Sequence, residues 1–551
     1  MFNFNPLAPV KLALNYLNRA TDPDRGFEPF LEGKLSGNPP CLCHHSYDTG
    51  DATARFIIAF IRARQMLGSL EISPAEAAMR ANIVKYLRPD GLTWKVDAPW
   101  SYPVAHLWDQ GRNLRAFIDL YIEDKNPAWL ERFRAMAKAL ENIADRQGND
   151  LVYPASSGWD GKTWLQKVPR GLDWKAPLGG QLIEPFARFA ETTGEEIYLD
   201  LARRVADGFL DGTRFIQPDG SFQGHFHNIA GICVGLCMLS RLGRWPRYRE
   251  AAQRTWDWIF RSGSAGSFGF GVEVAGRDCA HCETCCITDL IQWALESARA
   301  GRPEGYDDAE RFARNHLVEA QFRPDHAGLV KQGDKIPPDT DGIKYADAAD
   351  RMIGGFAGHV MPNDFSEADH QRLPPIWGCC SPAGVIGFYY AWDAAVVNET
   401  GRLTVNLWID RAFPGGRVAC FEPKEGLLMI ELDHPGRQQV IIRKRAGVDW
   451  QGASALTGSG QNSLREEPLG NVFEEKDGYL HAKAGMHSRV GLRYKPSRTT
   501  SSYLNPGYRN KENEQYTVHW TGHTVIGMDP AGVLAPLYKG RYKAHANHTA
   551  D

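Results

Sequence analysis

The sequence lacks an excess of charge of either sign, because its 63 basic and 66 acidic residues leave a formal net charge of −3. Without a basic surplus, we expect no general affinity for nucleic acid or for anionic membrane surfaces. The chain has no apolar run close to the roughly 18 residues that cross a bilayer, and its start lacks the basic residues and apolar core of a secretory signal. We therefore expect a cytoplasmic protein with neither a nucleic-acid nor a membrane partner.

The sequence also lacks the even, spaced cysteines of a disulfide framework. It has eleven cysteines, and six of them fall in two short segments, CAHCETCC (279–286) and WGCCSPAG (377–384). An odd number with adjacent pairs suits a reducing compartment and metal ligation. Thiolates with one carboxylate are ligands that zinc prefers, so the two segments would complete a four-ligand site if they met in space.

The first part of the chain has the periodicity of helices. From about residue 7 to 322, segments with apolar residues at helical spacing recur between short breaks, and another follows Cys380. We count roughly twelve helices, which six helical hairpins would account for. Six hairpins closed in a ring form an (α/α)6 toroid, although an open superhelix of helix pairs gives a similar pattern.

The last part of the chain has the two-residue alternation of strands. Segments such as RLTVNLWID, LLMIELD and QQVIIRK follow one another between Gly, Pro and Asp breaks, which predicts an antiparallel β-sandwich. A long segment rich in Asp, Gly and Pro, 323–378, is expected to lie over the mouth of the helical domain. The predicted fold is therefore multidomain α+β: a toroid over 1–398 that includes this loop, a sandwich over 399–540, and a frayed tail over 541–551.

The cysteines are predicted to lie at helix starts. Cys379 and Cys380 directly precede Ser381 and Pro382, an N-cap residue followed by a favoured first helical residue. The positive end of a helix stabilises thiolate and lowers the pKa of a cysteine there. Glu283 and Cys285 precede another helix, and two helix starts facing one another would bring all four side chains together.

These motifs resemble glycoside hydrolase family 127, the β-L-arabinofuranosidases. The order GSAGSFGFGVE, CETCC, a further helix pair, GCCSPAG and the strand RLTVNLWI is similar to that family, and the likeness covers roughly residues 175 to 410. Two departures concern the sugar side: Gln181 stands where the family has a histidine, and the spacing from Glu273 to Glu283 is shorter.

The resemblance implies a retaining glycoside hydrolase that acts on a terminal, β-L-arabinofuranoside-like sugar. It implies a Zn²⁺ ion held by Glu283, Cys285, Cys379 and Cys380, with Cys379 as the nucleophile and Glu273 as the general acid/base. Glu273, among glycines and apolar residues, is expected to have a raised pKa. Further candidates for binding the sugar are His45, Trp159, Gln181, His225, His227 and Trp377.

Other interpretations remain open at this point. The zinc could serve only to hold together a carbohydrate-binding or scaffold protein, or the toroid could belong to a sugar epimerase or uronyl hydrolase. Cys279, Cys282 and Cys285 match the start of an iron–sulfur motif, but the fourth cysteine with its proline is missing nearby. The expected partner is a small saccharide or glycoside, and the sequence leaves the oligomeric state open, a homodimer included.

Overall fold

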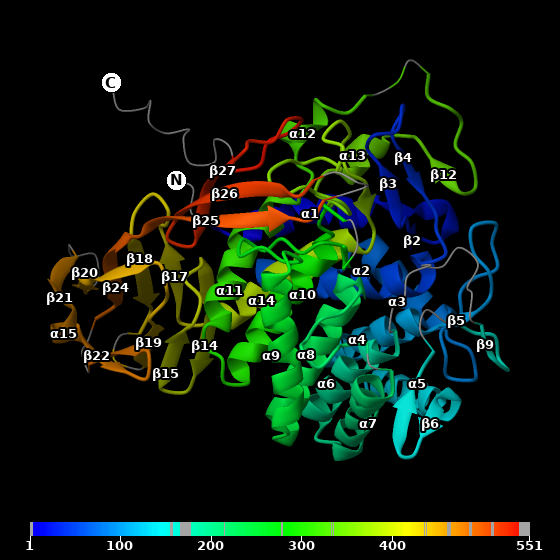
Figure 1. The fold of residues 1–551 in the computed structure, drawn as a ribbon, viewed down its shortest axis with the longest axis horizontal. Coiled ribbons are helices and arrows are strands. Elements are labelled where there is room, and N and C mark those ends of the chain that lie inside the picture. Colours follow the sequence, from blue (N-terminus) through cyan, green and yellow to red (C-terminus); the bar gives the residue numbers. More distant parts are fainter. Residues whose placement is uncertain are drawn as a thin grey trace.

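The helices of the toroid lie together with several short strands around them, and the larger sheets of the later chain lie beside this helical part (Figure 1). The computed structural model describes residues 4–538 except 155–157, 166–177, 214, 277–278, 332, 334, 435, 437, 460–463, 484–486 and 508–511. The tail predicted over 541–551 lies outside the described residues.

Six helices form a closed inner ring within the described part of the chain. Each packs against the next, and the last packs against the first, so the ring closes and the open superhelix is excluded. The inner helices are α2 (Thr53–Leu67), α4 (Leu107–Asp124), α6 (Ile183–Thr193), α8 (Phe226–Gly243), α10 (Thr284–Arg299) and α14 (Cys380–Ala395).

Six outer helices complete the hairpins and confirm the predicted (α/α)6 arrangement. They are α1 (Leu7–Arg19), α3 (Pro74–Lys85), α5 (Ala128–Ile143), α7 (Glu196–Asp207), α9 (Pro246–Arg261) and α11 (Gly305–Phe312). Five of them pack against the inner helix that precedes them, and α1 packs against both α14 and α2. Inner helices such as α10 are buried on nearly every face, whereas outer helices such as α9 bury one stripe.

One inner helix has the length and apolar composition of a membrane span. The 18 residues of α8 meet that criterion, which the sequence analysis had not expected of any segment. The helix is mostly buried between α6, α9 and α10, as a core helix of a toroid must be. Its apolar character is therefore explained by packing inside the protein.

The segment 323–378 is attached to the N-terminal part of the chain. Its strands β12 (Ile343–Lys344) and β13 (Ile376–Trp377) flank β4 (Cys41–Cys43) and β3 (Glu32–Lys34) in a four-stranded sheet. The short helices α12 (Pro324–Ala327) and α13 (Ala348–Met352) lie between them in sequence. This sheet brings Trp377 and Glu32 directly opposite one another.

The later strands form two main sheets and a separate smaller one. The five-stranded sheet has the order β14 (Val396–Glu399), β15 (Arg402–Val405), β19 (Gln439–Arg443), β23 (Tyr479–Ala482), β22 (Phe473–Lys476). The six-stranded sheet has the order β16 (Arg411–Phe413), β17 (Gly416–Cys420), β18 (Leu427–Leu432), β24 (Arg489–Pro496), β20 (Val448–Gly458), β21 (Arg465–Pro468), and α15 (Leu469–Val472) follows β21.

The prediction of an entirely antiparallel arrangement is wrong at one strand pair. β15 and β19 run parallel, because the chain between them crosses to the other sheet, forms β16 to β18 there, and returns in the same direction. The third sheet, β25 (Arg498–Asn505), β26 (Glu514–Thr521) and β27 (Thr524–Asp529), contacts the helical part. Tyr503 Oη donates to the Gly263 carbonyl and Asn505 Nδ2 donates to that of Ala280.

Short strand pairs fix the turns around the toroid. The pair β10 (Gly224–His225) and β11 (Val274–Ala275) places His225 opposite Val274, beside Glu273. The remaining short strands are β1 (Thr21–Asp22), β2 (Glu28–Pro29), β5 (Ala105–His106), β6 (Asp145–Gln147), β7 (Asp150–Val152), β8 (Gly158–Trp159) and β9 (Trp164–Leu165).

Candidate active site and metal centre

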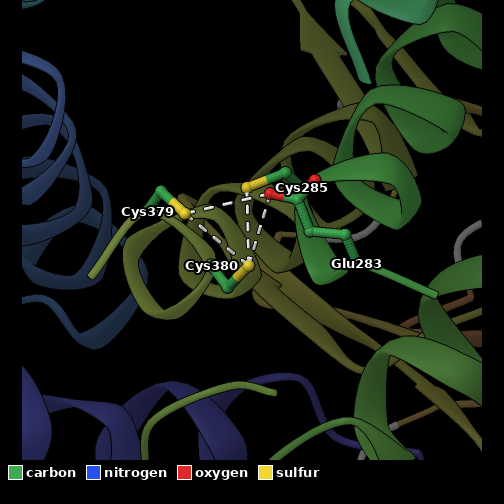
Figure 2. A group of neighbouring side chains, drawn as sticks. All are labelled: Glu283, Cys285, Cys379 and Cys380. Atoms are coloured by element: carbon green, nitrogen blue, oxygen red, sulfur yellow. Dashed lines mark hydrogen bonds between the residues drawn. The ribbon is translucent and has the colours of Figure 1, made fainter. Parts of the chain in front are cut away.

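Glu283, Cys285, Cys379 and Cys380 lie together at the starts of two neighbouring inner helices (Figure 2). Glu283 is the N-cap residue of α10 and Cys379 that of α14, while Cys285 and Cys380 belong to the first turns. All four are buried, and their ligand atoms lie within 4.8 Å of one another. The two segments therefore meet as the sequence predicted.

The distances within this group fit a tetrahedral metal site. The Sγ atoms of Cys285 and Cys380 are 3.7 Å apart, and those of Cys379 and Cys380 are 3.8 Å apart. Glu283 Oε1 lies 3.6 Å from Cys380 Sγ and 3.8 Å from Cys379 Sγ. Metal–sulfur bonds of about 2.3 Å at tetrahedral angles give sulfur–sulfur separations of about 3.8 Å. The four residues could thus hold one metal ion with little movement.

Among these thiols, Cys379 ionises most readily. Hydrogen bonds from the Cys285 and Cys380 thiols lower the pKa of Cys379 to about 6, against the opposing effect of burial. The pKa of Cys285 and that of Cys380 are raised, chiefly by burial. The site therefore concentrates negative charge on Cys379 before any metal is considered.

Neighbouring side chains form hydrogen bonds with two members of the four-residue group, Cys285 and Glu283. Arg55 Nη1 donates to Cys285 Sγ at 3.5 Å, and its Nε donates to Asp51 at 2.6 Å. His225 Nε2 donates to Glu283 Oε2 at 2.9 Å and so orients this carboxylate. Cys279 and Cys282 instead contact backbone carbonyls, so the described part of the chain does not assemble the iron–sulfur motif.

Glu273 is held by two histidines, and the expectation of a raised pKa is wrong for it. His281 Nε2 donates to Glu273 Oε2 at 2.8 Å, and His359 Nε2 lies 3.4 Å from the same oxygen. Burial favours the neutral acid, but the hydrogen bond from His281 and the nearby His359 imidazole prevail and hold the pKa of Glu273 below its usual range. Against the effect of burial, Cys279 and Glu273 raise the pKa of His281 to about 10. The proton of this pair therefore resides on His281.

One pocket joins Glu273 to Cys379. Its volume is about 240 Å³, and of the three grouped thiols only that of Cys379 lines it in the described structure. The other lining residues are Leu31, Glu32, His45, Tyr47, Asp51, Trp108, His225, Glu283 and Trp377. The pocket thus places the most acidic thiol of the group and the Glu273 carboxylate around the same space.

Three of the six residues predicted to bind sugar line this pocket, namely His45, His225 and Trp377. His227 is not among the lining residues, and its Nε2 accepts hydrogen bonds from Arg55 and Arg112, each at 2.8 Å. The other two predicted residues also lie outside the lining. Gln181 Nε2 donates to the Asn228 carbonyl at 2.5 Å, and Trp159 packs against Trp164 with ring centroids 5.3 Å apart.

Sequence reasoning missed Trp108 and Asp51 as pocket residues. Trp108 Nε1 donates a hydrogen bond to Asp51 Oδ1 at 2.7 Å, which holds the indole ring in its place in the pocket lining. Both lie at the starts of inner helices, as do Glu283 and Cys379. In a closed ring all inner helices begin at the same end, and the pocket lies at that end. The residues at each predicted inner-helix start were therefore candidates for lining the pocket.

Comparisons with solved structures show which fold this is. A GH127 β-L-arabinofuranosidase from Geobacillus stearothermophilus T6 superimposes with a TM-score of 0.57 at 14% identity, over 87% of this chain and 77% of that one. A second GH127 β-arabinofuranosidase gives 0.56 at 14% identity, over 95% and 81%. A structure described as a glycoside hydrolase gives 0.55 at 13% identity, over 92% and 85%. The sequence itself matches no protein-family model and no curated protein. The chain therefore has a GH127-like fold.

Proposed function

We propose that this chain is a retaining glycoside hydrolase that uses the Cys379 thiolate as its nucleophile and Glu273 as its general acid/base. The observation that carries the proposal is the shared pocket, in which Cys379 Sγ and the Glu273 carboxylate border one space of about 240 Å³. A retaining glycosidase needs a nucleophile and a proton donor that both reach the scissile bond. The GH127-like fold supports the same assignment.

We further propose that the four-residue group binds Zn²⁺ through Glu283, Cys285, Cys379 and Cys380. Three thiols and a carboxylate at tetrahedral spacing are a donor set that zinc prefers. When bound, the ion would keep these thiols ionised at neutral pH. Arg55 and His225 would then hold Cys285 and Glu283 as ligands, while Cys379 faces the substrate.

The chemistry proceeds in two displacements. Cys379 Sγ forms a bond to the anomeric carbon as the bond to the leaving oxygen breaks, and that oxygen takes a proton from Glu273. Because the resting proton lies on His281, we propose that it passes through Glu273 to the leaving group. In the second step Glu273 accepts a proton from water, the water oxygen bonds to the anomeric carbon, and the carbon–sulfur bond breaks.

The pocket supports a single uncharged sugar as the bound residue. Its volume is below the range of about 300–1,000 Å³ typical of drug-sized sites, which suits one terminal ring. The ionisable lining is acidic, with Glu32 and Asp51 beside Glu273 and Glu283, and its described residues include neither arginine nor lysine. A β-L-arabinofuranoside meets these requirements, whereas a uronide would place its carboxylate among carboxylates.

We also propose that residues 1–398, with the loop 323–378, are the catalytic part and that 399–540 form a β-sandwich. Strand β17 of the six-stranded sheet buries alternate residues, and β15 and β19 of the five-stranded sheet are buried along most of their length, which supports a sheet-on-sheet core. Strand β25 forms hydrogen bonds with the toroid, which supports an interface between the two parts.

A panel of aryl glycosides tests the proposed reaction. We expect turnover of the β-L-arabinofuranoside with retention of configuration, about one zinc per chain, and at least about 100-fold lower kcat/KM for aryl glucuronides. Release of nitrophenol gives the rates, and NMR of the first-formed sugar gives the anomer. Inactivity on all furanosides and pyranosides by the zinc-loaded protein would contradict the proposal.

Removal of His359 tests the control of Glu273. In His359→Asn, the imidazole 3.4 Å from the Glu273 carboxylate is lost, so the pKa of Glu273 rises and this acid keeps its proton to higher pH. The basic limb of the kcat/KM profile therefore moves to higher pH. The matched control is His370→Asn, which alters a similarly exposed histidine of the same loop that contacts Asp364. The hypothesis is wrong if both profiles coincide with that of the unaltered enzyme.

A further inference from the structure

A second cavity lies at the end of the toroid opposite the metal centre. Its volume is about 400 Å³, and all six inner helices contribute to its lining. These helices start at the metal-centre end, and residues late in them, such as Glu296 of α10 and Tyr389 of α14, line this cavity. From Cys379 to Tyr389 the helix advances about 15 Å, so the two cavities are separate.

Five arginines and three carboxylates line the cavity, and three of the arginines, Arg62, Arg115 and Arg188, meet in its deep part. Arg62 Nη2 donates to Asp119 at 2.6 Å, and Arg188 Nε donates to Glu184 at 2.5 Å. Arg115 lies between them and shares both acids, with a hydrogen bond to Glu184 and an ion pair to Asp119 at 3.5 Å. Three guanidinium groups thus share these two carboxylates, and the buried Glu296 carboxylate of the lining also attracts Arg188.

Two of these three arginines have a buried Nε–H group without a hydrogen-bond partner in the described structure. The side chains of Arg62 and Arg115 are only 8% and 9% exposed, and the Nε atom of each is buried without a hydrogen-bond partner among the described residues. A buried donor left unpaired costs about 1–3 kcal/mol.

Compensation of helix dipoles does not explain the deep arginines. That effect is confined to the last turn of a helix, where Arg241 and Arg299 lie. Arg62, Arg115 and Arg188 each precede the end of their helix by more than one turn. They converge from three different helices on the same space.

The cavity is open to ligands from outside. At its rim the side chains of Arg299 and Asp393 are 38% and 48% exposed, against 8% for Arg62 at its floor. The Asp393 carboxylate at this rim lies 4.0 Å from the guanidinium group of Arg411, a residue that does not line the cavity. The cavity is thus polar, rich in arginine and accessible from outside.

We propose that this cavity is a second ligand site, which binds the carboxylate or phosphate group of a small molecule against Arg62, Arg115 and Arg188. Guanidinium groups match the planar fork of a carboxylate and two oxygens of a phosphate, which makes arginine the preferred residue for such anions. The volume lies within the range of small-molecule sites. The site is independent of the proposed hydrolysis.

The test is calorimetric titration of the full chain with inorganic phosphate and, separately, with succinate. We expect a Kd below about 10 mM for at least one of them, a higher Tm in its presence, and the same affinity in Cys379→Ser as in the unaltered protein. The arm that binds more tightly identifies phosphate or carboxylate as the recognised group. Absence of binding and of a Tm change for both anions overturns the proposal.

Variants locate the binding. Arg188→Met is expected to weaken binding at least about 10-fold, while Arg134→Met, which removes an exposed arginine of α5 paired with Glu195, leaves it unchanged. Both variants should keep the metal content and the glycosidase rate. Arg188→Lys keeps the positive charge but loses the paired donors of the guanidinium group. It replaces Arg188→Met in this test if the methionine variant does not fold. Equal affinity in the Arg188 variants and the unaltered protein overturns this location.

Discussion

Replacing Cys379 by serine is expected to lower kcat by about 10⁴-fold or more on a substrate of the unaltered enzyme, because it removes the nucleophile itself. Serine is close in size to cysteine, but its hydroxyl stays protonated where the pKa of the thiol is about 6. Glu283, Cys285 and Cys380 remain as ligands, so the variant should keep much of its zinc and nearly the same Tm. Aryl glycoside kinetics, metal analysis and thermal unfolding together give the result.

Two further cysteine variants make this result specific. Cys380→Ser alters a proposed ligand that is not among the pocket-lining residues, so zinc content and Tm should fall together with activity. Cys420→Ser, in the strand-rich part, should leave rate and metal unchanged. If Cys379→Ser kept its turnover, the metal would be structural only and the nucleophile would have to be sought elsewhere.

Replacing Glu273 by glutamine is expected to lower kcat by about 10²- to 10⁴-fold, because the amide holds the geometry but transfers no proton. The loss should be smaller for aryl glycosides whose leaving phenol is more acidic, since these need less protonation. Rates across a series of substituted phenols measure this dependence. His281 and His359 lose the negative charge that raises their pKa values, so the pH profile should change together with the rate.

The matched control for this change is Glu367→Gln. Glu367 lies beyond His359, with its carboxylate 3.9 Å from His359 Nδ1, and it is not among the residues that line the pocket. We expect it to retain activity within about threefold of the unaltered enzyme. Similar losses in both glutamine variants, or a Glu273 variant of full activity, would falsify the acid/base assignment.

Local sequence was sufficient to predict the meeting of the two cysteine segments. Cys379 and Cys380 stand before Ser-Pro, and Glu283 and Cys285 begin an apolar helical segment, so both had to lie at helix starts. Ring closure brings such starts to one end. The predicted hairpins therefore also imply that Trp108 and Asp51 lie at this end, although neither residue was identified from the sequence.

The state of Glu273 could not be predicted from its neighbours in sequence. A carboxylate among glycines and apolar residues suggested a raised pKa, and burial does act in that direction. The deciding contacts are the hydrogen bond from His281 and the ion-pair contact of His359, which lies in a distant loop. Similarly, the direction of β15 relative to β19 depends on a crossover between sheets that strand periodicity does not encode.

The closure of the ring also bears on how the chain reaches its native state. Arg62 of α2 donates a hydrogen bond to Tyr389 of α14, and the two residues are 327 positions apart in the sequence. The other neighbouring inner helices are nearer in sequence, because an outer helix or the loop between α11 and α14 connects them. Contacts at such sequence separation form slowly, because the entropy of a long loop must be lost before they are gained. Cys285 and Cys380 join α10 to α14 across 95 residues, so a metal ion there ties the final helix of the circle to its predecessor. The proposed metal site would therefore also hold this last helix in position to meet the first.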